Sequence, residues 1–178
     1  FNKASIEYAI GKRTDINYIL GDYINEYPAG EYDTVIMIYC DLGTHSDKDR
    51  DKLLENIYHS LNDGGVFIFD VFTEELVKDK QKDKGWDYAH QGGFWSQEEY
   101  LLLSQTFHYP ENKAFGYQYN LLTKDETKQF IVWDRYYTEE EIILVLQNIG
   151  FRKVTIHKNI LDGNSFTSGS EMFIVAEK

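Results

Sequence analysis

The sequence predicts an α/β fold in which a mostly parallel sheet carries a small antiparallel insertion and ends in an antiparallel strand pair. Three observations support this fold class. Strand-like apolar segments at 35–38 and 66–72 flank a helical pattern at 53–61, an order typical of parallel strands covered by helices on both faces. Aromatic and polar residues alternate at 115–121, as in an antiparallel strand with one solvated face. A second helical pattern at 142–149 precedes two more apolar segments.

The first part of the chain predicts a helix followed by a short strand. Residues 5–13 place Ile6, Ala9 and Ile10 on one face, which is the spacing of an amphipathic helix. Residues 16–20 are mostly apolar and predict a short strand.

The next three elements predict one strand, helix and strand unit. Residues 32–39 form the first strand, and Ser46 followed by Asp49 marks the helix start, because each side chain can satisfy amide groups of the first turn. The helical pattern runs to Leu61, and the glycines in 62–65 favour its end there. A parallel connection of this kind is right-handed.

Residues 85–137 predict an insertion with a different character. Turn-forming residues at 110–113 and 123–126 separate segments of alternating pattern. We expect three or so antiparallel strands lying over the main sheet. The chain then returns to α/β character, with a second helix start at Thr138.

The C-terminal segment predicts the last elements of the main sheet. Gly150 ends the last helix, because glycine tolerates the left-handed conformation of a helix cap. Residues 151–160 and 170–177 predict two antiparallel strands, joined by a loop rich in Gly, Asn and Ser at 162–169.

Composition limits the classes of partner. The net charge of −12 disfavours nucleic acid and anionic membrane surfaces. The single cysteine, Cys40, excludes an internal disulfide and fits a reducing cytoplasm. No apolar run approaches the roughly 20 residues that a membrane span needs, and no side-chain spacing matches a metal site. We expect a cytoplasmic protein that acts on a small molecule, and a homodimer is left open.

Four segments, taken in order, resemble the class I S-adenosylmethionine-dependent methyltransferases. Residues 18–23 (YILGDY) resemble a strand that ends in an acid, and residues 32–41 (YDTVIMIYCD) the next strand. Residues 53–70 resemble the helix and strand that follow, and 137–151 the family's last helix. The resemblance spans nearly the whole chain outside the insertion. It implies a Rossmann-like sheet, S-adenosylmethionine as the cofactor, and methyl transfer to an N, O or C atom of a small-molecule acceptor.

The resemblance also identifies what the sequence lacks. The family's glycine-rich turn and ribose-binding acid are absent, and residues 1–9 resemble the segment just after that acid, so both are expected upstream of Phe1. We therefore expect a fragment with open sheet edges and weak cofactor binding. Its parts would be a truncated cofactor-binding core (1–84), an insertion on the acceptor side (85–137) and a C-terminal segment that completes the core (138–178).

Five residues are candidates for cofactor binding by this resemblance. Asp22 would accept a hydrogen bond from the adenine amino group, and Tyr23 would pack against the adenine ring. The backbone at Tyr39 would approach the methionine part. Cys40 is interpreted as a packed side chain, since no charged partner is evident to activate it. Asp41 would contact the methionine ammonium group or cap the next turn. A solvated turn is the competing interpretation of Asp22.

The aromatic residues of the insertion suggest an acceptor pocket, because aromatic walls exclude water and attract amines. The core of a small sheet is the competing interpretation. Arg135 could anchor a carboxylate of the acceptor or form an ion pair with a nearby acid. His45 is a candidate base, or a surface histidine. The predicted acceptor-side residues are Trp95, Tyr117, Tyr119, Trp133, Arg135 and Tyr137.

Two other functional classes compete with methyl transfer. One is a non-catalytic α/β module that binds a ligand or a partner. The other is a nicotinamide-dependent enzyme, which the antiparallel final strand pair and the turn at 21–23 favour less. A glycine-rich turn upstream of Phe1 would support the methyltransferase, whereas an initiator Met directly before Phe1 would support the non-catalytic module.

Overall fold

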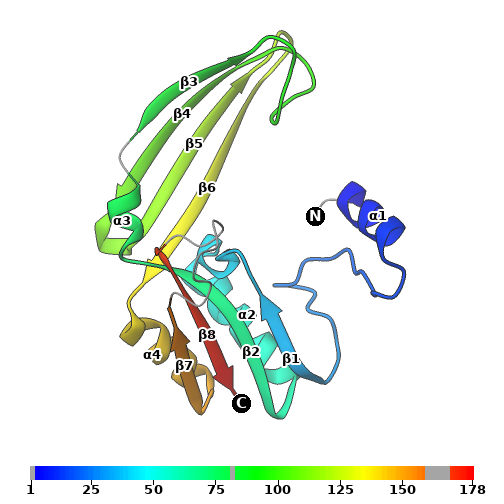
Figure 1. The fold of residues 1–178 in the computed structure, drawn as a ribbon, viewed down its shortest axis with the longest axis vertical. Coiled ribbons are helices and arrows are strands. Elements are labelled where there is room, and N and C mark those ends of the chain that lie inside the picture. Colours follow the sequence, from blue (N-terminus) through cyan, green and yellow to red (C-terminus); the bar gives the residue numbers. More distant parts are fainter. Residues whose placement is uncertain (1–2, 81–82, 159–168) are drawn as a thin grey trace.

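The computed structural model describes residues 3–80, 83–158 and 169–178, and its fold is α/β, as the sequence predicts (Figure 1). Within these residues the main sheet has the strand order β1, β2, β8, β7. β1 is parallel to β2, and β8 is antiparallel to both of its neighbours. The elements of this main unit are β1 (Tyr32–Met37), α2 (Asp47–Ser60), β2 (Leu61–Thr73), α4 (Glu139–Ile149), β7 (Lys153–His157) and β8 (Glu171–Glu177).

The hydrophobic core lies on one face of the main sheet. Phe67, Phe69 and Val71 of β2 are completely buried in a cluster with side chains of α2 and α4, and these two helices contact each other. No described helix covers the other face, where Ile36 is 63% exposed. The expectation that helices cover both faces is therefore wrong for the part of the chain that the structure describes.

Capping side chains start both long helices where the sequence predicts. The Ser46 hydroxyl accepts a hydrogen bond from the Asp49 amide at 3.2 Å, and the Thr138 hydroxyl accepts one from the Glu141 amide at 3.2 Å. These bonds satisfy amide groups that have no partner within the helix. Gly150 ends α4 as expected.

The end of α2 differs from its prediction. The helix stops at Ser60, and residues 62–65 already belong to β2. Leu61 adopts an extended conformation and is 3% exposed. Burying this side chain in the core turns the chain into the strand before it reaches the glycines.

The N-terminal part differs most from the prediction. α1 (Lys3–Lys12) is helical, but it stands apart from the rest of the molecule and buries no residue (Figure 1). Residues 16–20 form no strand, and Ile19 and Leu20 are 57% and 49% exposed. A strand needs a neighbour for its backbone groups, and no described strand pairs with this segment.

The insertion forms a long antiparallel arm, not a layer over the main sheet (Figure 1). It has four described strands, where three or so were expected. Phe72 and Thr73 of β2 pair in parallel with the end of the last one, so the arm extends the sheet edgewise. The arm contains α3 (Leu76–Asp79), β3 (Lys84–Ala89), β4 (Tyr100–Tyr109), the 3-10 turn η2 (Pro110–Asn112), β5 (Ala114–Leu122) and β6 (Thr127–Tyr137).

β7 and β8 form the predicted antiparallel C-terminal pair, whereas most of the predicted loop at 162–169 lies outside the described residues.

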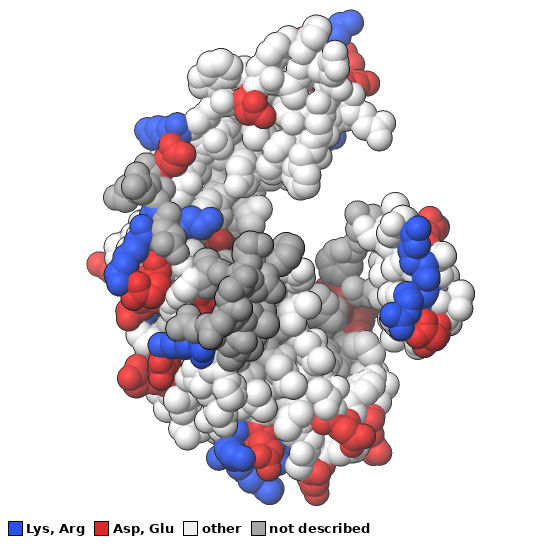
Figure 2. All heavy atoms as spheres, in the orientation of Figure 1, with Lys and Arg blue, Asp and Glu red and all other residues white. Residues whose placement is uncertain are grey.

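Charged side chains gather at the base of the molecule, and the concave side between the arm and α1 shows few of them below the tip of the arm (Figure 2). Among the described residues, no helix combines the length and apolar character that crossing a bilayer requires.

An ion-pair network ties the root of the arm to the main unit. Arg135 of β6 pairs with Asp47 of α2 and with Glu141 of α4, the latter at 2.7 Å, and Lys113 binds Glu141 at 3.0 Å. Partial burial acts to raise the pKa of Glu141, but the hydrogen bonds from Lys113 and Arg135 outweigh it and hold that pKa below its usual value. Of the two roles that the sequence left open for Arg135, the structure contains the ion pair.

Glu141→Gln is expected to lower the free energy of unfolding by about 1 kcal/mol at neutral pH. Because the pKa of Glu141 is lowered by folding, its contribution is present above the unfolded-state value of about 4.3 and is lost as the pH falls through the folded-state value. Urea unfolding at neutral pH and near pH 3 measures the difference, which should shrink at the lower pH. The exposed neighbour Glu140, changed to Gln, is the control. An equal loss at both pH values would contradict this account.

Candidate functional site

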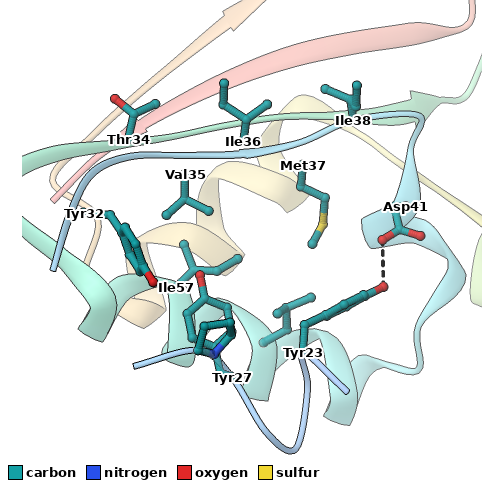
Figure 3. A pocket seen from close by; sticks show the side chains of 12 residues that line it. Tyr23, Tyr27, Tyr32, Thr34, Val35, Ile36, Met37, Ile38, Asp41 and Ile57 are labelled. Carbon is teal, nitrogen blue, oxygen red and sulfur yellow. Dashed lines mark hydrogen bonds between the residues drawn. The ribbon is translucent and has the colours of Figure 1, made fainter. Parts of the chain in front are cut away.

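A hollow of about 450 Å³ runs along the edge of β1 that faces away from β2 (Figure 3). It lies between that strand, the loop at 23–28 and α2, and its lining is mainly apolar. In α/β sheets, ligands bind outside the carboxyl ends of the strands, and this hollow reaches that end of β1. We call it the β1 hollow. Its lining includes Tyr23, Tyr27, Val35, Met37, Asp41 and Ile57.

The chain leaves β1 through a strained turn. Tyr39 and Cys40 have φ angles of 70° and 55°, a left-handed conformation that costs a non-glycine residue roughly 1–3 kcal/mol. The buried carboxylate of Asp70, from β2, accepts hydrogen bonds from the Cys40 amide at 3.0 Å and the Cys40 thiol at 3.7 Å. Asp70 therefore holds the turn in place. The sequence reasoning missed this role, although an acid inside an apolar strand is an unusual feature that could have signalled it.

Cys40 occupies the position of a packed side chain. It is 3% exposed, and burial, followed by the negative charge of Asp70, raises the pKa of its thiol far above the usual value. A nucleophilic cysteine needs the opposite shift. Burial and the raised pKa therefore both disfavour the thiolate form of Cys40.

The structure brings only part of the predicted cofactor set to the β1 hollow. Tyr23 and Asp41 line it, whereas Asp22 and Tyr39 do not. The Asp22 carboxylate accepts hydrogen bonds from its own loop, including the side chain of Asn25 at 2.7 Å, and these bonds lower its pKa. The side chain of Tyr39 is 87% exposed, so only its backbone is fixed beside the hollow.

Tyr23, Asp41 and His45 form a hydrogen-bonded cluster at the end of the β1 hollow. The Tyr23 hydroxyl donates to Asp41 at 2.7 Å and lies 3.1 Å from Nε2 of His45. Burial, followed by the hydrogen bond to Asp41, raises the pKa of Tyr23, so the hydroxyl remains protonated and acts as a donor. Asp41 begins the short 3-10 turn η1 (Asp41–Thr44) that leads into α2.

A second hollow, of about 300 Å³, lies between η1, the start of α2 and the root of the arm. His45 lines it, whereas Tyr23 and Asp41 line the β1 hollow. The cluster therefore contributes residues to both hollows. We call the second one the Trp133 hollow. Its lining includes Thr44, His45, Asp47, Asn112, Trp133 and Arg135.

The predicted acceptor-side residues do not form a single pocket. Side chains alternate between the two faces of a strand, and Trp133 pairs with Gly116 across β5 and β6. Tyr117 and Tyr119 therefore point to the opposite face, where both line a polar hollow and Tyr119 stacks with Trp95. Tyr137 is 1% exposed and belongs to the core of the main unit. Trp133 and Arg135 alone share the Trp133 hollow.

Asp134 is a half-buried carboxylate that the sequence reasoning did not single out. Burial raises its pKa, against a smaller opposing effect of Tyr117. The Tyr117 hydroxyl lies near this carboxylate but is buried without a hydrogen bond of ordinary geometry to any described residue. The charge of Asp134 also reaches Cys40. No sequence signal separates Asp134 from the other acids of the chain, since its burial beside Tyr117 arises only in the folded structure.

Solved structures with this arrangement of elements include methyltransferases. The chain aligns with an S-adenosylmethionine-dependent methyltransferase from Clostridium acetobutylicum at a TM-score of 0.69 and 14% identity, over 98% of this chain and 70% of that one. An amino pentose methyltransferase from Micromonospora echinaspora aligns at 0.61 and 12%, over 99% and 71%. A sugar N-methyltransferase from Streptoalloteichus aligns at 0.59 and 12%, over 99% and 68%.

No family model and no curated protein sequence matches the chain. At identities this low, the likeness concerns the fold alone. It shows that this chain has the fold of the class I S-adenosylmethionine-dependent methyltransferases.

Proposed function

We propose that this protein transfers a methyl group from S-adenosylmethionine to a small-molecule acceptor. The observation that carries the proposal is the turn at Tyr39 and Cys40, which Asp70 fixes at the carboxyl end of β1 beside a hollow. Strained backbone that is held by a buried partner is typical of functional sites. The solved structures of the same fold support the choice of methyl transfer, because their names state that activity.

S-adenosylmethionine supplies an electrophilic methyl group when it is bound, so the chain has to orient two molecules in line and exclude water. In the proposal, the Tyr23 ring and the apolar side chains of β1 hold the adenosyl part in the β1 hollow. Asp41 and the backbone of the strained turn face the amino acid part. Asp22 would exchange its hydrogen bond with Asn25 for one with the adenine amino group.

The proposed division of the chain follows from these roles. Residues 1–84 contain the β1 hollow, residues 85–137 provide the acceptor side, and residues 138–178 complete the main sheet. One edge of β1 is unpaired in the described residues. By the resemblance, the family's strand that carries the glycine-rich turn would pair there.

Calorimetric titration with S-adenosylhomocysteine tests the proposal. The product of the whole reading frame is expected to bind with micromolar affinity, and Asp22→Ala to weaken binding about 10-fold, since one charge-assisted hydrogen bond is worth about 1.4 kcal/mol. The 178-residue chain alone is expected to bind weakly or not at all, because it lacks the glycine-rich turn.

Asp63→Ala is the matched control, because it removes an exposed carboxylate at the far end of β2 and should leave binding unchanged. Absence of binding by the whole protein would contradict the proposal. That result would favour the alternative, a non-catalytic α/β module that binds a different ligand or a partner.

A further inference from the structure

Trp133 forms a fixed apolar surface inside the Trp133 hollow. A Cβ atom at Gly116 would lie 2.9 Å from the indole, so the ring lies directly against the backbone of β5. The ring of Tyr109 packs against it with 5.6 Å between centroids. Even so, 43% of Trp133 stays exposed. An aromatic ring held in this way offers a surface for the C–H face of a saturated ring.

The charged groups of the Trp133 hollow are already paired. Arg135 binds Asp47 and Glu141, and Asp47 also binds Arg50 at 3.1 Å. Only Nε of Arg135 has no partner among the described residues, and it is buried, so an acceptor carboxylate would have to break these pairs to reach the two terminal nitrogens of the guanidinium. By contrast, the carboxamide of Asn112 lines the hollow and makes no hydrogen bond to any described residue. The hollow therefore suits an acceptor with hydroxyl groups and without a negative charge.

His45 presents a proton-accepting nitrogen. The Tyr23 hydroxyl has one hydrogen, and the Asp41 carboxylate is a stronger acceptor for it than a neutral imidazole. Nε2 of His45 must therefore carry its own hydrogen and donate it to the Tyr23 oxygen. Nδ1 then keeps a free lone pair. A proton that binds at Nδ1 gives an imidazolium, whose positive charge the Asp41 carboxylate would stabilise through Tyr23.

We infer that the Trp133 hollow binds the methyl acceptor, that the acceptor is an amino sugar, and that His45 takes the proton from its amine. The inference rests on the proposed function, because Tyr23 and Asp41 line the hollow in which the methyl donor would lie. The amine nitrogen bonds to the methyl carbon while the bond from that carbon to the sulfonium sulfur breaks. The sulfur keeps the electron pair, and the proton on nitrogen moves to Nδ1 of His45.

An amino sugar fits each part of this site. Its saturated ring can stack on Trp133, its hydroxyl groups can bind the Asn112 carboxamide, and its amine is the nucleophile that His45 deprotonates. A sugar acid would place a carboxylate near paired charges, and a flat aromatic phenol would leave the polar groups of the hollow without partners.

Indole NMR signals test the subsite without any cofactor. The chain has three tryptophans, so single substitutions to Phe assign their N–H signals. Millimolar D-glucosamine is expected to shift the Trp133 signal. Trp86 lies on the same face of the arm, is 73% exposed and does not line the hollow, so its signal serves as the internal control. D-glucuronate is expected to shift Trp133 less. No shift of Trp133, or an equal shift of Trp86, would overturn the subsite.

His45→Gln in the product of the whole reading frame tests the base. With S-adenosylmethionine and D-glucosamine, kcat is expected to fall about 100-fold, while KM for D-glucosamine changes less than about 3-fold. Trp133→Ala is expected to raise KM instead. Added imidazole should restore part of kcat in His45→Gln, which a loss of structure would not allow.

An unchanged kcat in His45→Gln would overturn the role of His45. The amino sugar would be ruled out as the acceptor if a protein whose Trp133 signal shifts and which binds S-adenosylhomocysteine formed no methylated D-glucosamine. Failure of the proposed function gives a different result, namely a whole protein that does not bind S-adenosylhomocysteine. The indole titration can still succeed in that case, because it uses no cofactor.

Discussion

Asp70→Leu is expected to lower the free energy of unfolding by about 3 kcal/mol and to abolish binding of S-adenosylhomocysteine. Leucine has a similar volume but cannot accept the hydrogen bond from the Cys40 amide, which measures 3.0 Å. A buried amide without a partner costs about 1–3 kcal/mol. The left-handed conformation of Tyr39 and Cys40 then loses its only side-chain partner among the described residues, so the strain of the turn is released by rearrangement.

Chemical denaturation measures the stability change, and calorimetry measures the loss of the ligand. Asp70→Asn is the matched control, because its carbonyl oxygen can still accept from the Cys40 amide. This variant should retain most of the stability and binding. An equal loss of stability and binding in the two variants would show that the negative charge matters and that the hydrogen bond to the turn does not.

Gly43→Ala is expected to lower the free energy of unfolding by about 2 kcal/mol. A Cβ atom at this position would lie 2.8 Å from the backbone oxygen of Arg135, which cannot rotate away as a side chain could. η1 would therefore separate from β6, and with it His45 would separate from Trp133. Both the root of the arm and the Trp133 hollow depend on this close approach.

Gly21→Ala is the control for Gly43→Ala, because its new methyl group would meet nothing closer than a side-chain carbon of Ile19 at 4.0 Å. Urea unfolding should distinguish the two substitutions. The indole signal of Trp133 should also move in Gly43→Ala and stay in place in Gly21→Ala. Unchanged stability in Gly43→Ala would mean that η1 and β6 are not in contact in solution.

Elements that depend on local chemistry could be predicted from the sequence. Ser46 and Thr138 begin their helices because each hydroxyl binds an amide three residues later, and that spacing is visible in the sequence. The alternation of aromatic and polar residues in β5 is likewise visible in the sequence, because successive side chains of a strand point to opposite faces. The parallel pairing of β1 with β2 also follows from the helix between them.

Features that depend on distant partners could not be predicted. Residues 16–20 have the composition of a strand but no described strand beside them. The sequence suggests that the aromatic residues of the arm line one pocket. The register of β5 and β6 instead places Tyr117 and Trp133 on opposite faces. The hydrogen bond between Asp70 and Cys40 joins residues 30 positions apart, so no local pattern contains it.

The candidate site combines both kinds of information. The resemblance pointed to Tyr23 and Asp41, and side-chain chemistry pointed to His45, as separate residues with separate roles. Their hydrogen bonds join them into one cluster, which requires the loop at 23–28 to fold back against η1. Because the residues of this cluster line two hollows, both the methyl donor site and the acceptor site are proposed beside it.

The central claim is that the carboxyl end of β1 binds an adenosyl ligand. Amide correlation spectra of the product of the whole reading frame, titrated with S-adenosylhomocysteine, test it directly. The account predicts that the largest shifts occur at the amides of Tyr23, Cys40 and Asp41, with little change in β7. No shifts at these amides, or larger shifts at the tip of the arm, would contradict it.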